Sequence, residues 1–255
     1  LADNFEEVAQ FWDSGNFKGY VASDSANALN RFLSNLQPLE SDFADLENAL
    51  HLTHGPYHNP YDLTTFYDNH DMARINATDN GFINAHNWLF TVRGIPVVYM
   101  GSEIGFMRGT AEHAGNRNYV GQERLDAAVN HPIQQALTDI ANVRKNTPAL
   151  QRGIQVNVAL SGHTAAFYRV INTEESQQTA LVLLNKGDSA QTFNVNQFIQ
   201  SGNWVEQLTG RELTIAEGGK LSATVEPNGV QVWLREGKVE NEALLAQIKY
   251  QLSRQ

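Results

Sequence analysis

The 255-residue sequence contains no cysteine, and this absence excludes several kinds of chemistry. Without a thiol the protein cannot use a cysteine nucleophile, a disulfide or a cysteine-ligated zinc ion. Basic clusters are also missing: 28 acidic against 18 basic side chains give a formal net charge of -10, and no run of Lys and Arg could follow a phosphate backbone. Nucleic acid is therefore not expected as a partner.

Long apolar runs are absent as well. No stretch reaches the roughly 18 to 20 apolar residues that a spanning helix needs, and the N-terminus lacks a signal-peptide pattern, so we expect a soluble protein with no membrane partner. The compartment stays open, with a secreted or periplasmic location favoured over a cytoplasmic one. The first residue is Leu1 rather than Met, from which we expect a processed or excised piece of a longer chain.

The first part of the chain combines helical and strand patterns. Apolar residues recur at helical spacing, and two short apolar runs are typical of strands. The second run, 95–100, is expected to be a strand buried on both faces. Strand, helix, strand in this order predicts a parallel βαβ unit. The expected helices span 4–50 (three segments), 81–94 and 132–145, the expected strands 20–23, 63–67 and 95–100, and a long loop 102–130.

After residue 150 the pattern changes to short alternating segments separated by Gly, Asn and Asp turns. Several short strands without helices predict a small antiparallel β-sandwich. The last segment has Leu and Ile at helical spacing. We therefore expect an α/β domain over residues 1–149, an all-β sandwich over 150–236 and a C-terminal helix within 237–255.

Polar side chains follow both strands of the predicted βαβ unit. "DNHD" (68–71) follows the first strand and "GSEIGF" (101–106) follows the second. In parallel α/β architectures the residues at the carboxyl ends of strands face a shared cleft. A lone His-Asp pair is more often a cap that closes a strand end. Two successive polar strand ends, with Asn116 and Arg117 in the loop beyond, favour a functional site instead.

Three motifs in order carry a resemblance to a known family. "FYDNHDMARI" (66–75) resembles the last short signature of the α-amylase family, glycoside hydrolase family 13. "RGIPVVYMGSEIGF" (93–106) resembles that family's eighth barrel strand, and "GNRN" (115–118) resembles a segment of cyclodextrin glucanotransferases and cyclomaltodextrinases. The resemblance implies the C-terminal strands and helices of a TIM (β/α)8 barrel, with 20–23, 63–67 and 95–100 as strands six to eight, followed by the sandwich that the family calls domain C.

The resemblance also implies roles for individual residues. Asp71 would stabilise the oxocarbenium-like transition state, and His70 would donate hydrogen bonds to sugar hydroxyls. Asn69 would orient this pair. Arg117, with Asn116 beside it, would hold a sugar further along the donor side, although Ala114 and Gly115 depart from the usual tyrosine and proline.

Two motifs of the family are absent from the chain. Its retaining mechanism needs a nucleophilic carboxylate and a carboxylic acid about 5 Å apart, which the fourth and fifth barrel strands supply. Three strands also cannot close an eight-stranded barrel. We therefore expect the C-terminal part of an enzyme acting on α-1,4-glucans such as starch and maltodextrins, by hydrolysis or glycosyl transfer, with this chain inactive alone. Its partners would be the glucan and the missing N-terminal part of the barrel. No cofactor is expected in this chain, and the resemblance places the family's calcium ligands mainly in the missing part.

Other interpretations stay open beside this one. A non-catalytic glucan-binding or scaffold protein could keep part of the fold, and an unrelated βαβ enzyme would require all three motif matches to be accidental. Glu103 is expected to support a strand end, and Arg74 to pair with a nearby carboxylate. No metal site is expected, since His51, His54 and His58 are interpreted as surface histidines. Core positions are expected for Trp12, Trp88, Trp204 and Trp233.

Overall fold

The computed structural model describes residues 42–55, 57, 59–111, 114 and 117–254. The predicted sixth barrel strand at 20–23, and the helical segments predicted before residue 42, lie outside these residues.

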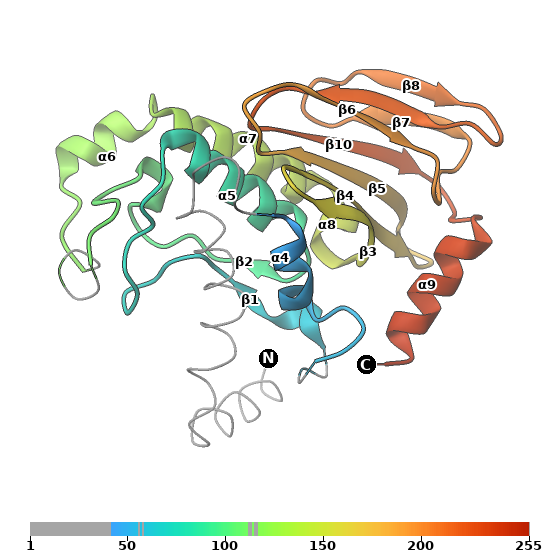
Figure 1. Ribbon diagram of the computed structural model, residues 1–255, viewed down its shortest axis with the longest axis horizontal. Helices are drawn as coiled ribbons and strands as arrows, with labels where there is room; N and C mark the ends of the chain where they lie inside the picture. Colours follow the sequence, from blue (N-terminus) through green and yellow to red (C-terminus); the bar gives the residue numbers. More distant parts are fainter. Residues whose placement is uncertain (1–41, 56, 58, 112–113, 115–116, 255) are drawn as a thin grey trace.

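A parallel βαβ unit opens the described structure (Figure 1). Strand β1 (Thr64–Thr65) pairs with β2 (Ile95–Pro96), and helix α5 (Asp79–Thr91) connects them. Helix α5 begins where the Thr78 hydroxyl oxygen accepts a hydrogen bond from the Gly81 amide at 3.2 Å. After α5 the chain turns at Gly94 with φ 92°, where a Cβ atom would lie 2.8 Å from the Leu63 carbonyl oxygen, so only glycine fits there. The predicted βαβ unit is confirmed.

Both strands of this unit are shorter than the predicted 63–67 and 95–100. The prediction that the second run is buried on both faces is wrong, because Ile95, Val97 and Met100 are 51%, 41% and 44% exposed. Among the described strands β2 pairs with β1 alone. Several apolar side chains of this run are therefore left partly exposed in the described part of the chain. Two paired strands do not show the complete barrel that the resemblance implies.

Further helices surround the βαβ unit. The predicted long loop over 102–130 contains the 3-10 helix η4 (Ser102–Ile104) and helix α6 (Gln122–Ala128). Helix α7 packs against α5 and confirms the helix predicted over 132–145. In the described part of the chain, no helix is both long and apolar enough to cross a membrane. The remaining elements of this part are α4 (Ala44–Glu47), η2 (Asn48–Leu50), η3 (Pro60–Asp62), α7 (Pro132–Asn146) and α8 (Pro148–Arg152).

The predicted antiparallel sandwich follows α8. Six strands form one sheet in the order β3-β4-β5-β10-β7-β8, and β6 pairs with β9 in a second sheet. The strands of the larger sheet are β3 (Ile154–Ser161), β4 (Thr164–Asn172), β5 (Gln177–Asn185), β7 (Gly202–Glu206), β8 (Glu212–Ile215) and β10 (Gly229–Glu236). The smaller sheet contains β6 (Gln191–Val195) and β9 (Leu221–Val225).

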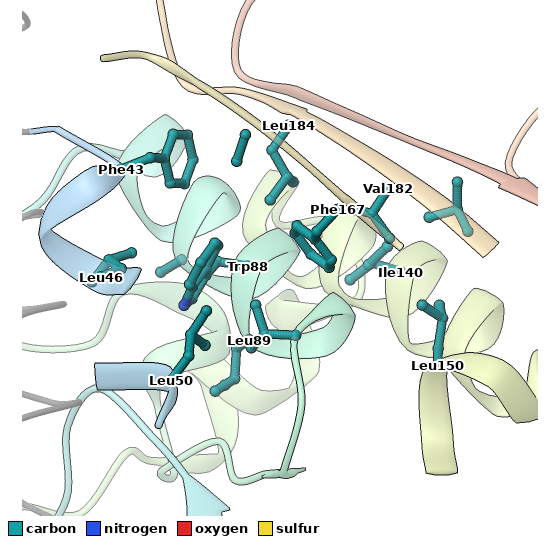
Figure 2. Packing of buried hydrophobic residues seen from close by; sticks show 14 of the residues in the cluster. Phe43, Leu46, Leu50, Trp88, Leu89, Ile140, Leu150, Phe167, Val182 and Leu184 are labelled. Carbon is teal, nitrogen blue, oxygen red and sulfur yellow. The ribbon is translucent and has the colours of Figure 1, made fainter. Parts of the chain in front are cut away.

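The central strands β4 and β5 are buried on both faces because a different layer covers each face. On one face Phe167 meets Trp88 of α5 edge-on, with ring centroids 6.0 Å apart, and Val182 and Leu184 join the same cluster (Figure 2). The domain boundary at residue 150 stays a prediction, since this apolar core runs from the helices into the sheet. The other face contributes to a second core, which includes Tyr168, Leu181, Leu183, Trp204 and Trp233.

Three buried arginines, Arg93, Arg144 and Arg169, lie around the turn after α5, and Arg169 of β4 ties this turn to the sandwich. Burial lowers the pKa of these guanidinium groups to about 10, 10 and 9 respectively. Two of them donate to carbonyls around the carboxyl end of α5, where the helix dipole favours positive charge. This arrangement fixes the turn between α5 and β2. The contacts are Arg144 to Phe90 (3.0 Å) and Gly94 (2.6 Å), Arg169 to Thr91 (2.8 Å) and Gly153 (3.2 Å), and Arg93 to Leu50 (2.8 Å) and Ala49 (2.7 Å).

The C-terminal helix is present as α9 (Glu242–Leu252), and two of its side chains are buried against the rest of the fold. Leu244 is fully buried in the core between the sheets. Gln251, 3% exposed, donates to the Gln155 carbonyl at 2.7 Å and accepts a hydrogen bond from the Tyr61 hydroxyl at 3.0 Å. Helix α9 is therefore bonded both to the sandwich and to the segment before β1.

Candidate active site

The candidate site begins where β1 ends and the chain leaves the core. Asn69 Oδ1 accepts a hydrogen bond from the Asp71 amide at 2.8 Å, which makes a tight turn of the kind that asparagine favours. This turn carries His70 and Asp71 to the surface, where the side chains of both are 58% exposed. The orienting role expected for Asn69 stays a prediction.

The Asp71 carboxylate meets two basic side chains. Its Oδ2 atom lies 3.2 Å from His70 Nε2, and its Oδ1 atom accepts a hydrogen bond from Arg117 Nη2 at 2.7 Å. Arg117 Nε also donates to the His70 carbonyl at 3.2 Å. The structure thus brings together four of the five predicted site residues, Asn69 to Asp71 with Arg117, while Asn116 lies outside the described residues.

A buried carboxyl group lies beneath this exposed cluster. Asp68 is 2% exposed, and the Ser102 hydroxyl lies 2.9 and 3.0 Å from its two oxygens. Burial raises the pKa of the Asp68 carboxyl to about 6, although the Ser102 hydrogen bond and the Arg74 charge act in the opposite direction. The contact between Asp68 and Ser102 could not be predicted from the motifs, since it joins two segments 34 residues apart.

Arg74 is buried beside Asp68, with its Nη1 atom 4.0 Å from Asp68 Oδ2. This confirms the expectation that Arg74 pairs with a nearby carboxylate. Nη1 donates to the Met100 carbonyl at 2.8 Å, and the guanidinium carbon lies 4.6 Å from the Tyr99 ring centroid and 5.7 Å from that of Phe106. Within the described residues Nε and Nη2 have no hydrogen-bond partner.

A second buried contact joins the segment after β1 to α5. The Tyr67 hydroxyl lies 2.6 Å from His86 Nε2, and both side chains are almost fully buried. Burial lowers the pKa of His86 to about 3, so this histidine is neutral near pH 7. The contact fixes the residue before Asp68 from the helix side. The contact could not be predicted from the sequence, because a histidine within a helical pattern does not show which side chain it will contact.

The remaining candidates lie away from this cluster. Glu103 is half-buried in η4, next to Ser102, and its supporting role stays a prediction. His51 and His54 lie in the loop before β1, and His58 is outside the described residues. Across the described ranges no three His, Cys, Asp or Glu side chains are grouped so that they could hold a metal ion. The core prediction is confirmed for Trp88, Trp204 and Trp233, while Trp12 is outside the described residues.

Comparison with known proteins gives the fold and the motifs a context. No family model matches the chain. The "Beta/alpha-amylase" of Paenibacillus polymyxa is 27% identical over 183 residues, covering 67% of this chain and 14% of that protein. The "Cyclomaltodextrin glucanotransferase" of Bacillus sp. (strain 1-1) is 27% identical over 207 residues, covering 78% of this chain and 28% of that protein. The resemblance to the α-amylase family is confirmed.

A solved structure agrees with this family resemblance. The α-amylase of Geobacillus thermoleovorans, crystallised with acarbose, superposes with a TM-score of 0.68 at 21% identity. The match covers 84% of this chain and 47% of that protein, so the chain spans less than half of it. The similarity is to the carboxyl-terminal part of such family members.

Proposed function

We propose that this chain is the carboxyl-terminal part of an α-amylase-family enzyme that cleaves α-1,4-glucans, such as starch and maltodextrins, with retention. The bond would be broken by hydrolysis or by transfer of the glycosyl unit. The observation that carries the proposal is the exposed cluster of His70, Asp71 and Arg117 at the carboxyl end of β1. The glucanotransferase among the relatives, and the acarbose bound to a structural neighbour, support the substrate class.

The chemistry of the cluster fits the proposed role of Asp71. A positive charge develops at the anomeric carbon in the transition state, and a fixed carboxylate beside it lowers the barrier. His70 offers a ring N–H group to a sugar hydroxyl. Asp71 Oδ1 is held by Arg117, but both side chains are more than half exposed, and such pairs contribute at most about 1 kcal/mol. Sugar hydroxyls can therefore replace Arg117 at Asp71 at low cost, leaving the guanidinium to bind another hydroxyl.

The nucleophile and the general acid would come from a part of the enzyme outside this chain. The exposed apolar residues of the run 95–100, which are Ile95, Val97 and Met100, support this proposal because the rest of a barrel would cover them. This chain covers only 14% and 28% of the two relatives, which also supports the proposal that the rest of the enzyme lies outside it. The same proposal assigns no cofactor to this chain, and calcium to the rest of the enzyme.

The proposal is tested by replacing Asp71 in the complete enzyme. We expect Asp71→Asn to lower kcat for soluble starch about 100- to 1,000-fold, the effect of removing one preorganised electrostatic group. The change should leave the thermal unfolding midpoint unaltered, since the side chain is exposed. Asp139→Asn, on the exposed face of α7, is the matched control and should keep the full rate.

A rate within threefold of the wild type for Asp71→Asn would contradict the proposed role. Binding of maltooligosaccharides by the complete protein, without any release of reducing sugar, would instead support the glucan-binding interpretation.

A further inference from the structure

We propose that Asp68, Arg74 and Ser102 are positioning residues that hold the loop 69–73, and through it His70 and Asp71, in one orientation. The catalytic consequence rests on the function proposed above, whereas the structural consequence for the loop does not. None of the three touches the exposed cluster through a hydrogen bond of its own side chain, so they act on it through the backbone and through Tyr99.

The loop is fixed at both of its ends to the same neighbouring segment. Asp68, which precedes the loop, accepts the hydrogen bond from Ser102 Oγ. Arg74, which follows it, donates to the Met100 carbonyl at 2.8 Å. Met100 and Ser102 are separated by one residue in the segment between β2 and the start of η4, so both ends of the loop are held at one place. Such a closed arrangement removes the hinge motions that a loop fixed at one end would keep.

The planar side chain of Arg74 also connects to His70. Its guanidinium lies over the Tyr99 ring at 4.6 Å, and the Tyr99 ring centroid lies 6.3 Å from that of His70. A shift of Arg74 would therefore move Tyr99 and change the support behind His70. Lysine keeps the charge but has neither the planar group that stacks on aromatic rings nor the fork of donors.

The buried charges of Asp68 and Arg74 explain why neither residue can be replaced without a large loss of stability. The side chains of Asp68 and Arg74 are both 1% exposed and 4.0 Å apart. Removal of one partner of a buried pair leaves the other charge uncompensated, and this is strongly destabilising. The other titratable groups that act on Asp68 are Glu103 of η4 and Arg74 itself, and Tyr67 lies next to it in the chain. The conservative changes Ser102→Ala and Arg74→Lys keep both charges and are the better tests.

The test uses the complete enzyme with Ser102→Ala and Arg74→Lys, together with the rescue variant Ser102→Thr. Two properties are measured: kcat and KM for a maltooligosaccharide, and amide hydrogen exchange of peptides covering 68–74, with 177–185 of β5 as the internal reference. We expect both variants to exchange about 10-fold faster in the loop and normally in β5, with kcat lowered about 10- to 100-fold and KM changed less than threefold. Ser102→Thr, which keeps the hydroxyl, should restore both properties. Arg152→Lys, at an exposed position, is the control for Arg74→Lys.

Unchanged loop exchange in both variants would overturn the proposal, whatever happens to kcat. Faster loop exchange with an unchanged kcat would also overturn it, because positioning would then have no catalytic effect. Failure of the proposed function is recognised separately: Asp71→Asn would keep its rate, while the exchange results would still report whether the loop is held.

Discussion

At the scale of single residues, the site combines an exposed cluster with a buried one. His70 and Asp71 are solvated and can exchange partners, while Asp68 and Arg74 below them are almost fully buried. The exposed group is suited to binding a polar substrate. The buried group is suited to fixing the backbone that presents it.

The buried carboxyl group of Asp68 predicts a pH dependence of stability. Burial raises its pKa from the usual 3.8 to about 6, against the opposing effects of Ser102 and Arg74, so the folded state binds an extra proton between these values. This contribution to stability is present at low pH and is lost as the pH rises through about 6. His86, with its pKa lowered to about 3, has the opposite sign and favours folding as the pH rises from about 3 towards 6.5.

Asp68→Asn isolates the first effect, because an amide cannot ionise. Between about pH 4 and pH 7 we expect the free energy of unfolding of this variant to improve, relative to wild type, by about 2 kcal/mol, most of the effect of a shift of about two pKa units. Urea unfolding at the two pH values measures the change. The substitution also removes the charged partner of Arg74. This changes the free energy of unfolding by a constant amount, which cancels when the two pH values are compared. The same difference in free energy of unfolding between the variant and the wild type at both pH values would contradict the burial effect. That result is expected for the control variant Asp139→Asn.

The residues of the exposed cluster could be singled out from the sequence, but for the buried group only the pairing of Arg74 with a carboxylate could be predicted. Asn69, His70, Asp71 and Arg117 could be predicted because they lie in recognisable motifs at or beyond strand ends. Ser102, Tyr67 and His86 could not, since their roles depend on contacts between segments far apart in the chain. A polar residue at a strand end signals a site, but it does not show which partner will be buried with it.

At the scale of elements, helix α9 connects two parts of the fold through hydrogen bonds. Gln251 bonds to Gln155 of β3 and to Tyr61 before β1, and Gln155 in turn accepts a hydrogen bond from the Arg93 amide at 2.9 Å. This chain of buried hydrogen bonds links the last turn of α9 to the turn after α5. The apolar pattern of the helix predicted its existence, but the polar residue in its last turn determines where it docks.

Gln251→Ala is expected to lower the free energy of unfolding by about 1 to 3 kcal/mol, because it leaves the Gln155 carbonyl buried without this donor. Amide exchange within α9 should become faster, while exchange in β5 should not change. Gln247→Ala, on the exposed face of the same helix, is the matched control. Equal stability of the two variants would show that α9 is held by its apolar face alone.

Two elements differ from the sequence prediction for physical reasons. Helix α6 was predicted to be part of a loop. None of its residues is buried, so no apolar period marks it in the sequence. The run 95–100 was expected to be buried on both faces, yet Ile95, Val97 and Met100 are exposed, and among the described strands only β1 lies beside β2. The apolar pattern of this run thus predicts more burial than the described residues provide.

At the scale of the whole molecule, the six-stranded sheet is the centre of the structure. One face packs on α5 and its neighbours, and the other packs on β6 and β9 (Figure 1). The order of βαβ unit, helix and sandwich could be predicted from periodicity alone. The shared core and the three buried arginines could not, because they depend on how the layers meet.

The most direct test of the account is made on the protein purified from its natural source. Its intact mass is determined, and reducing-sugar release from soluble starch is measured on the same sample. The account predicts a mass well above the 28.4 kDa of this chain, together with sugar release. A mass near 28.4 kDa without sugar release would contradict the account, and a glucan-binding or scaffold role would then replace the enzymatic one.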